Sequence, residues 1–290
     1  MNNLWASFLV VAIGSGCARA EEPTAAPATK IVALGDLHGD FTNALAVLEL
    51  AGIVDEKGHW NATNTTLVQT GDTTDRGPQS KEVMDLIRRL QKEAAKAGGR
   101  VVPLLGNHEM MNLHGDWRYV SPEDVEGFGG TEERKRAFSQ EGEYGQWLFS
   151  LDIAAKVEDS VFVHGGIHPD FAKGGVEELN KHFHGVHTAK DDPIFGSQGP
   201  LWYRGYAQEP EESACPRLTM ALEDLGVKRM VVGHTTQRTG KIEVRCQGRL
   251  HMIDVGIAKH YGSNLAAWEW VDGDARALYQ SGAIDLEDPS

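Results

Sequence analysis

The sequence is short of positive charge. Its 290 residues contain 28 Lys and Arg against 42 Asp and Glu, which gives a formal net charge of −14. Phosphate backbones and anionic lipid surfaces are held mainly by Lys and Arg, so this balance argues against nonspecific binding to nucleic acid or to an anionic membrane. A site that handles phosphate in this chain therefore needs a local source of positive charge, and bound metal ions are the obvious one.

A membrane-spanning apolar run is also lacking at the N terminus, where Leu4–Ile13 is too short to cross a bilayer comfortably. Small residues follow, and Ala18–Ala20 matches the small-x-small pattern of a cleavage site. We therefore predict a signal peptide over residues 1–20 and export, to the periplasm or the medium of a bacterium. Two alternatives remain: an ordinary apolar N terminus, and a lipid anchor at Cys17, because Gly14–Cys17 loosely resembles a lipoprotein processing site.

Cysteine is scarce, with three residues in the chain. Either processing route removes or modifies Cys17 and leaves Cys215 and Cys246 as an even pair in an oxidising compartment. A disulfide between them is one interpretation and two free thiols are the other, because a sequence does not supply the Cα separation that a bridge requires.

Internal repeats are absent, and an apolar content of 41% is enough for a sizeable core. After a Pro- and Ala-rich linker at residues 21–29, we predict one α/β domain over residues 30–280 and a flexible acidic tail at 281–290. Alternating strand and helix patterns up to Leu105 predict a βαβαβ unit with parallel strands. The domain has insertions at about 112–150 and 170–215. Within them, residues 131–151 are predicted to be helical and 170–215 irregular, followed by a helix over 216–225.

Five apolar segments each run into a side chain that binds metals. They are rich in Val, Leu and Ile and have no helical period, which is typical of strands buried on both faces. In sheets covered by helices, the carboxyl ends of the strands open into a common crevice, so we expect the five ends to converge. The side chains at these ends are Asp36 with His38, Asp72, Asn107, His164 and His234.

Each of these residues also has an ordinary structural explanation. A pair such as Asp36 and His38 occurs by chance in solvated turns, and a single histidine is more often packed in a core. For all five strands to end in this way by chance is improbable. One carboxylate, such as that of Asp72, can bridge two ions about 3.5–4 Å apart. An amide with two imidazoles suits a borderline transition metal, such as Mn, Fe or Zn.

Three of these motifs are specific enough to indicate a family. Gly35–Gly39 reads GDLHG, Gly71–Gly77 reads GDTTDRG and Gly106–Glu109 reads GNHE, followed by His164 in HGG and His234 in GHT. This order resembles the phosphoprotein phosphatase family of the calcineurin-like metallophosphoesterase superfamily, over about residues 30–256. The sequences of residues 110–116 and 142–147 are similar to those of the bacterial Shewanella-like phosphatase branch.

The resemblance implies a metallophosphoesterase fold, with a central β-sandwich of mixed sheets flanked by helices. It also implies a metal-dependent protein phosphatase in which a hydroxide between two metal ions attacks phosphorus directly. The first ion would be held by Asp36, His38 and Asp72. The second would be held by Asp72, Asn107, His164 and His234.

Four further residues receive catalytic roles from the same resemblance. His108 would give a proton to the leaving group, and Asp75 would orient and stabilise its imidazolium. Arg76 would bind the phosphoryl oxygens. Arg204 is our candidate for a second arginine, with a surface arginine beside an aromatic residue as the alternative.

The implied substrate is a phosphoprotein or phosphopeptide, and analogy with the branch favours phosphotyrosine. One departure from the family leaves inhibitor sensitivity open: Ser/Thr-specific members carry a Ser-Ala-Pro-Asn-Tyr-Cys-Gly loop, whereas Asp254–Gly262 reads DVGIAKHYG. Two other functions stay open. One is a nucleotide phosphohydrolase of the diadenosine-tetraphosphate type, and the other is a non-catalytic, metal-stabilised binding protein.

Some residues near these motifs stay without an assigned role. Glu109 either holds Arg76 or a backbone group. His260 and Tyr261 could approach the site from a later loop. The three histidines His182, His184 and His187 look like a metal patch, but on a polar segment a solvated cluster is the commoner explanation.

Overall fold

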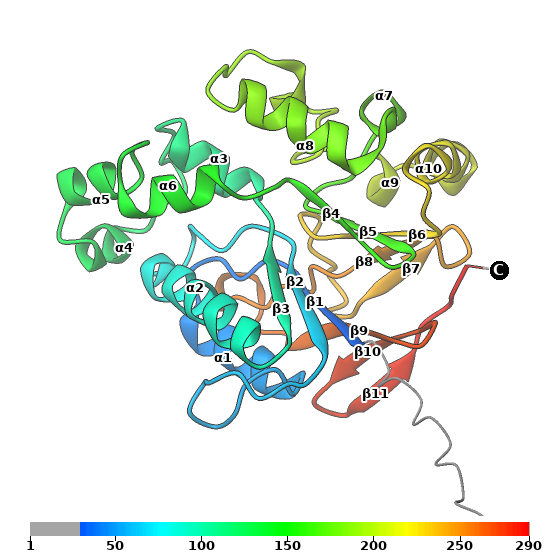
Figure 1. The fold of residues 1–290 in the computed structure, drawn as a ribbon, viewed down its shortest axis with the longest axis horizontal. Helices are drawn as coiled ribbons and strands as arrows, with labels where there is room; N and C mark the ends of the chain where they lie inside the picture. The colour runs from blue at the N-terminus through cyan, green and yellow to red at the C-terminus, as the bar shows by residue number, and fades with distance from the viewer. Residues whose placement is uncertain (1–29, 290) are drawn as a thin grey trace, which may run out of the picture.

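Two mixed β-sheets lie face to face at the centre of the protein, with helices on their outer sides (Figure 1). The computed structural model describes residues 30–289. The predicted signal peptide at 1–20, with Cys17, and the linker at 21–29 lie outside the described residues. Across 30–289, no helix combines the length and the apolar character that crossing a membrane requires.

The first sheet has the strand order β11-β10-β9-β1-β2-β3. Strands β1 (Lys30–Leu34), β2 (Thr65–Gln69) and β3 (Arg100–Pro103) are parallel. They are connected by helices α1 (Phe41–Leu50) and α2 (Ser80–Lys96), which confirms the predicted βαβαβ unit. Strands β9 (Ala266–Val271), β10 (Asp274–Tyr279) and β11 (Gly282–Asp285) extend the sheet in antiparallel fashion.

The second sheet has the order β4-β5-β6-β8-β7. Strands β5 (Ser160–Val163), β6 (Arg229–Val232) and β8 (Leu250–Met252) are parallel, so their carboxyl ends share one edge. Strands β4 (Ala154–Val157) and β7 (Glu243–Arg245) are the antiparallel edge strands. The two mixed sheets flanked by helices are the predicted fold class.

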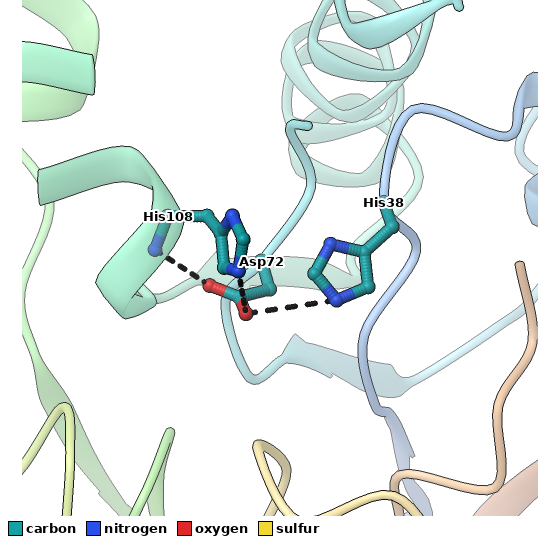
Figure 2. Close-up of side chains that lie close together, drawn as sticks. All are labelled: His38, Asp72 and His108. Atoms are coloured by element: carbon teal, nitrogen blue, oxygen red, sulfur yellow. Dashed lines mark hydrogen bonds and ion pairs between the residues drawn. The ribbon is translucent and has the colours of Figure 1, made fainter. Parts of the chain in front are cut away.

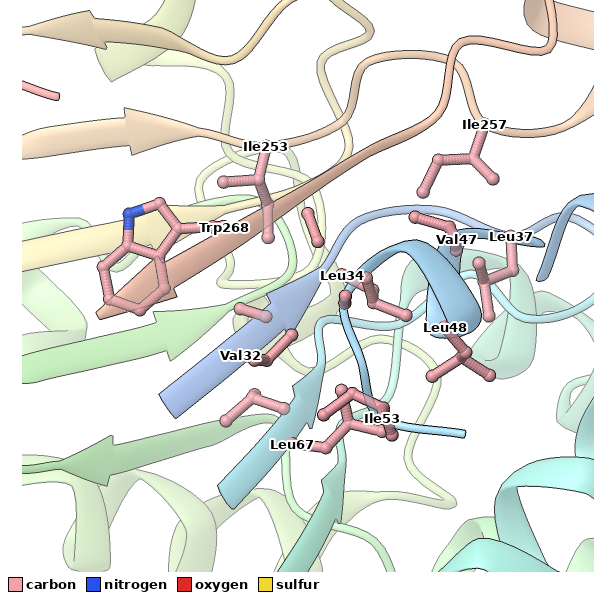
Figure 3. Packing of buried hydrophobic residues seen from close by; sticks show 14 of the residues in the cluster. Val32, Leu34, Leu37, Val47, Leu48, Ile53, Leu67, Ile253, Ile257 and Trp268 are labelled. Carbon is pink, nitrogen blue, oxygen red and sulfur yellow. The ribbon is translucent and has the colours of Figure 1, made fainter. Parts of the chain in front are cut away.

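The core runs continuously from α1 through the first sheet to the second. Val32 and Leu34 of β1 belong to one buried cluster with Leu48 of α1 and Trp268 of β9 (Figure 3). Phe162 of the second sheet joins this cluster and packs edge-on against Trp268, with ring centroids 5.5 Å apart. Strand β1 is therefore buried on both faces, as its unbroken apolar sequence predicts.

Helix α3 (Asn107–Leu113) leads into the first insertion, which contains α4 (Pro122–Gly127), α5 (Thr131–Ala137) and α6 (Glu143–Phe149). The prediction of one helical stretch over 131–151 is wrong because the chain turns between α5 and α6. At Gly142 a Cβ atom would lie 2.1 Å from the Arg136 carbonyl oxygen, so the turn requires glycine there.

The second insertion contains α7 (Pro169–Ala172), α8 (Gly175–Val186), η1 (Pro193–Phe195), α9 (Gly205–Gln208) and the start of α10 (Glu211–Leu225). The prediction of an irregular segment over 170–215 is wrong. Val176, Leu179 and Phe183 are buried at helical spacing along α8, and this period was present in the sequence. Cys215 of α10 forms a disulfide with Cys246, with a Cα separation of 5.3 Å.

The acidic C-terminal segment is a strand and not the flexible tail that the sequence predicted. Residues Gly282–Asp285 pair with β10, and the Asp288 carboxylate accepts a hydrogen bond from the Ala275 N–H. Asp288 also lies 2.7 Å from the guanidinium of the buried Arg229. A turn of only two residues separates β10 from β11, so local hairpin geometry organises the segment despite its charge.

Candidate metal centre and active site

The ends of five strands converge on one cleft, as the sequence predicted. Asp36 and His38 follow β1, Asp72 follows β2, Asn107 follows β3, His164 follows β5 and His234 follows β6. All six side chains are buried. A cavity of about 180 Å³ is lined by five of them, with His164 beneath it, and Arg76, His108 and Arg204 also line it.

The Asp72 carboxylate is the centre of the cluster. Its Oδ2 lies 3.7 Å from His38 Nε2, 3.8 Å from His108 Nε2 and 3.3 Å from His164 Nε2. Figure 2 shows the His38 and His108 rings beside this carboxylate, and their centroids are 4.9 Å apart in an edge-to-face arrangement. The three nearby imidazoles lower the pKa of Asp72 well below its usual range, although burial alone would raise it. Asp72 is therefore placed to contribute to two neighbouring ion sites.

Around this centre, the remaining predicted ligands divide into two groups. His38 Nε2 lies 3.7 Å from Asp36 Oδ2, and the other ring nitrogen, Nδ1, hydrogen-bonds to the Thr74 carbonyl oxygen at 3.1 Å. His164 Nε2 lies 2.9 Å from Asn107 Oδ1, and its Nδ1 hydrogen-bonds to the Thr70 carbonyl oxygen at 3.0 Å. In both histidines the backbone contact fixes the ring and turns Nε2 toward Asp72, which is how metal-binding histidines are usually oriented.

The chemistry of these residues fits bound cations. His234 Nε2 is buried without a hydrogen-bond partner among residues 30–289, and ligand atoms of Asp72, His164 and His234 lie within 4.8 Å of one another. Burial lowers the pKa of His38 to about 4 and that of His234 well below its usual value, so both rings are neutral, the form that binds metals. Burial and the carboxylates of Asp254 and Asp72 raise the pKa of Asp36, a strain that a cation would relieve.

The loop backbones that carry these residues are held in an unfavourable conformation. His38, Asp72, Asp75, Arg76 and His234 all have positive φ angles, between 44° and 69°. Such conformations persist only where the surrounding structure imposes them, and they concentrate at functional sites.

Glu109 is the residue that holds the loop after β2. Its buried carboxylate accepts hydrogen bonds from the N–H groups of Asp72, Thr73 and Thr74, at 2.8 to 3.1 Å. It also accepts the N–H of Gly106 at 2.8 Å and so caps the start of α3. Of the two roles considered for Glu109, the structure therefore supports the contact with backbone groups.

His108 is paired with Asp75 on the side of the ring that faces away from Asp72. The distance from His108 Nδ1 to Asp75 Oδ2 is 2.7 Å. Burial alone would lower the pKa of His108, but the carboxylates of Asp72 and Asp75 raise it above its usual value. The distances to His38 and Asp72 alone would also allow His108 to bind an ion. A protonated ring cannot do so, and the pairing with Asp75 favours the protonated form.

The two predicted arginines lie at the cleft. Arg204 Nη1 donates to the His234 carbonyl oxygen at 2.6 Å and to Thr235 Oγ1 at 3.1 Å. The Arg76 guanidinium stacks over the ring of Tyr119, 3.9 Å from the ring centroid. Its Nε is buried without a partner in the described residues, so the group keeps donor capacity for a ligand.

Sequence reasoning missed two features of the site. Tyr119 and Trp202 line the cleft, and nothing in their local sequence marks them. Tyr261, which the sequence suggested could approach from a later loop, lines the cleft as well, whereas His260 does not. Asp254 is buried behind Asp36 and accepts a hydrogen bond from Thr236 Oγ1 at 2.6 Å. Because Asp254 follows β8, the rule used for the other strand ends would have found it.

The histidines of the second insertion do not join a metal cluster. His184 Nε2 lies 2.9 Å from Asp152 Oδ1, and His182 Nε2 lies 3.3 Å from Asp192 Oδ1. None of the groups within residues 30–289 that could hold a metal includes these histidines or His187. Simple pairing with carboxylates explains two of the three residues.

Comparison with known proteins gives consistent matches. Residues 29–238 match the family model of the calcineurin-like phosphoesterases. An uncharacterized protein of Schizosaccharomyces pombe is 39% identical over 268 residues, which cover 87% of this chain and 80% of that protein. Shewanella-like protein phosphatase 2 of Arabidopsis thaliana is 30% identical, over 81% of this chain and 73% of its own length.

A solved structure agrees with this result. The crystal structure of a cold-active protein-tyrosine phosphatase from a psychrophilic Shewanella superimposes with a TM-score of 0.80 at 30% sequence identity. The match covers 89% of this chain and 80% of that one.

Proposed function

The chain belongs to the calcineurin-like phosphoesterase family and is a phosphatase, and from this premise we propose that it hydrolyses phosphotyrosine in proteins. The observation that carries the choice of substrate is the ring of aromatic side chains, Tyr119, Trp202 and Tyr261, around the cleft. An aromatic leaving group can pack against such rings, which contribute about 0.5–1.5 kcal/mol per pair beyond the area they bury. The Shewanella protein with the similar structure is named a protein-tyrosine phosphatase.

Two metal ions would be held by the residues of the strand ends. Asp36, His38 and Asp72 would form one site, and Asp72, Asn107, His164 and His234 the other. This mixture of imidazole, amide and carboxylate suits Mn, Fe or Zn. When bound, a pair of such ions acidifies water and polarises the phosphoryl group, which is the chemistry that a phosphate ester requires.

The two arginines bind and orient the substrate. Arg76 and Arg204 both line the cleft, and each presents a planar guanidinium that can bind two phosphoryl oxygens. They supply the local positive charge that the acidic chain otherwise lacks. Arg204 is anchored to the His234 carbonyl oxygen, so its position is linked to that of a metal ligand.

His108 supplies the proton. As the bond between phosphorus and the leaving oxygen breaks, His108 Nε2 donates to that oxygen, and Asp75 stabilises the ring on the Nδ1 side. General acid catalysis of this kind contributes about 10²- to 10⁴-fold in rate. A protein that only binds has no use for a paired acid over its metal site, which argues for an enzyme.

A substrate panel tests the proposal. Protein reconstituted with manganese is assayed on a phosphotyrosyl peptide, the matching phosphoseryl peptide and diadenosine tetraphosphate. We expect kcat/KM to be at least about tenfold higher for phosphotyrosine than for phosphoserine, since a lost aromatic contact is worth about 1.4 kcal/mol. Exclusive cleavage of the dinucleotide would replace our proposal with the nucleotide phosphohydrolase alternative.

We further propose that the protein is exported. The disulfide between Cys215 and Cys246 supports this, because disulfides persist in oxidising compartments. Mass spectrometry of the protein from its native host should find a mature N terminus at Glu21. A lipid-modified N-terminal Cys17 would instead establish the membrane-anchored alternative, and an intact Met1 would contradict export.

A further inference from the structure

A fully buried arginine, Arg134, lies behind the pair formed by His108 and Asp75. It belongs to α5 in the first insertion and has no exposed surface. It does not line the cleft over the metal ligands. Burying a guanidinium is expensive unless its donors are paired, so its partners indicate why it is there.

One branch of contacts leads from Arg134 to the proton donor. Arg134 Nη1 donates to Asn112 Oδ1 at 2.7 Å, and Asn112 Nδ2 donates to Asp75 Oδ1 at 2.8 Å. The other oxygen of Asp75 is the one that pairs with His108 Nδ1, at 2.7 Å. Both carboxylate oxygens of Asp75 therefore have a fixed neighbour.

A second branch closes the network into a ring. Arg134 Nε donates to Asp124 Oδ2 at 3.0 Å, and Asp124 Oδ1 accepts the N–H of Ser80 at 2.8 Å. The hydroxyl oxygen of Ser80 accepts the N–H of Asp75 at 3.1 Å. The ring runs from Asp75 through Ser80, Asp124, Arg134 and Asn112 back to Asp75, and it joins the insertion to the loop after β2.

Aromatic side chains hold the guanidinium in place. Its central carbon lies 4.5 Å from the Phe138 ring centroid, 5.1 Å from that of Trp117 and 5.3 Å from that of Phe128. Contacts of this kind stabilise a cation most where water is excluded. Arg134 is thus fixed by packing as well as by hydrogen bonds.

The direction of each hydrogen bond matters here. An amide side chain has one accepting and one donating end, and the guanidinium can only donate. Because Arg134 occupies the oxygen of Asn112, the Asn112 NH₂ group must face Asp75. Asn112 Nδ2 also donates to the His108 carbonyl oxygen at 2.8 Å. Without Arg134 the Asn112 oxygen loses its partner, and only this bond resists a turn of that oxygen toward the Asp75 carboxylate. Such a turn would repel Asp75 and move it away from His108.

We propose that Arg134 is a positioning residue for proton donation by His108, acting through Asn112 and Asp75. This inference rests on the proposed role of His108. In the reaction, the electrons of the breaking phosphorus–oxygen bond go to the leaving oxygen, which takes the proton from His108. The attacking water supplies the oxygen that binds phosphorus and the proton that restores His108.

The inference predicts a dependence on the leaving group. 2,4-Dinitrophenolate leaves as a stable anion and needs little protonation, whereas phenolate needs much more. We expect Arg134→Met to lower kcat on phenyl phosphate about 10- to 100-fold, within the range of general acid catalysis, with KM little changed. On 2,4-dinitrophenyl phosphate the same variant should retain kcat within about threefold.

The matched control is Arg229→Met. Arg229 is also buried and ion-paired, but its partners are Asp159 and Asp288, at the other end of the second sheet from the metal ligands. This variant should lose stability without changing the ratio of rates on the two substrates. Arg134→Lys should recover part of the rate on phenyl phosphate, because an ammonium group also donates only.

Other outcomes are decisive as well. If Arg134→Met lost kcat equally on both substrates while its metal content stayed intact, the proposed role of Arg134 would be wrong. The same conclusion would follow if kcat fell on neither substrate. If Arg134→Met does not fold, Asn112→Leu removes the hydrogen-bonded link and leaves only the 3.8 Å ion pair between Arg134 Nη2 and Asp75 Oδ1. It must then show the same selectivity. His108→Asn is assayed in parallel: if it shows no dependence on the leaving group, the assignment of His108 fails instead of the assignment of Arg134.

Discussion

The Asp72 carboxylate contacts both the main chain and the side chain of His108. Asp72 Oδ1 accepts the N–H of His108 at 2.9 Å, and Oδ2 of the same carboxylate lies 3.8 Å from His108 Nε2. One side chain therefore fixes both the start of α3 and the centre of the candidate metal site. The proposed metal binding and proton donation are therefore geometrically linked, yet they depend on different atoms.

Substitution of His108 should separate the two functions. His108→Asn keeps the backbone N–H that Asp72 binds, so we expect both metals to stay bound while kcat falls about 10²- to 10⁴-fold on a phosphotyrosyl peptide. Metal content and kcat are measured on the same preparation. Loss of metal in this variant would show that His108 is a ligand.

Asp72→Ala, unlike His108→Asn, should lose the bound metals. It removes the carboxylate oxygens that face three imidazoles, so we expect both metals to be lost and activity with them. Elemental analysis after dialysis against metal-free buffer checks this. A variant that retained two ions would contradict the central position of Asp72.

Gly106→Ala should damage the site without removing any ligand. A Cβ atom at position 106 would lie 2.2 Å from Asp72 Oδ1 and 2.4 Å from Asp72 N. Asp72 must shift, so we expect weaker metal binding and a loss of about 1–3 kcal/mol in the free energy of unfolding. Gly185→Ala, in α8, is the matched control because nothing lies within 4 Å of its added Cβ. Equal metal affinity in the two variants would disprove the close approach.

Arg204→Ala should weaken substrate binding. Charged hydrogen bonds contribute about 1.5–3 kcal/mol, so we expect kcat/KM on a phosphotyrosyl peptide to fall about 10- to 100-fold. Arg204→Lys should restore only part of this, since an ammonium group cannot bind two oxygens in one plane. An unchanged kcat/KM in both variants would show that Arg204 has only a structural role.

His251 should make the protein sensitive to mild acid. Trp268 Nε1 donates to His251 Nδ1 at 2.8 Å, and His251 Nε2 bonds to the Gly248 carbonyl oxygen at 2.9 Å, which fixes a neutral ring between the sheets. Burial lowers the pKa of His251 from 6.5 to about 4. Between these values the unfolded chain binds a proton that the folded chain does not.

The contribution of His251 to stability is therefore complete above about pH 6.5 and is lost as the pH falls toward 4, by up to about 3 kcal/mol. Thermal unfolding of the wild type and of His251→Gln between pH 4 and 7.5 measures it. The variant should show the shallower decline in Tm toward acid. Parallel pH profiles would exclude His251 as the cause.

Reduction of the disulfide should destabilise the second half of the chain. Cys215 and Cys246 are 31 residues apart, and opening a loop of that length costs about 3–4 kcal/mol in the chain-entropy model. Urea unfolding with and without reductant measures the difference, and a Cys215→Ala, Cys246→Ala variant is the control that reductant must not affect. An unchanged midpoint in the wild type would contradict the prediction.

The sequence by itself was enough to predict that the candidate metal ligands lie together. Each follows a short, largely apolar strand, and parallel strands place their carboxyl ends along one edge, so Asp36, Asp72 and Asn107 had to meet. The order of the motifs was also enough to identify the family. These inferences succeed because they depend on local patterns and on one general rule of sheet topology.

Only the tertiary structure placed the residues that surround the ligands. Tyr119, Trp202 and Tyr261 reach the cleft from three separate segments, and Arg134 reaches Asp75 from 59 positions away. The way those segments pack decides which side chains share a buried space. The local spacing of apolar residues in the sequence does not predict this packing. Strand pattern therefore determined where the candidate metal ligands lie, whereas long-range packing decided what else lines the cleft and what holds the proposed proton donor.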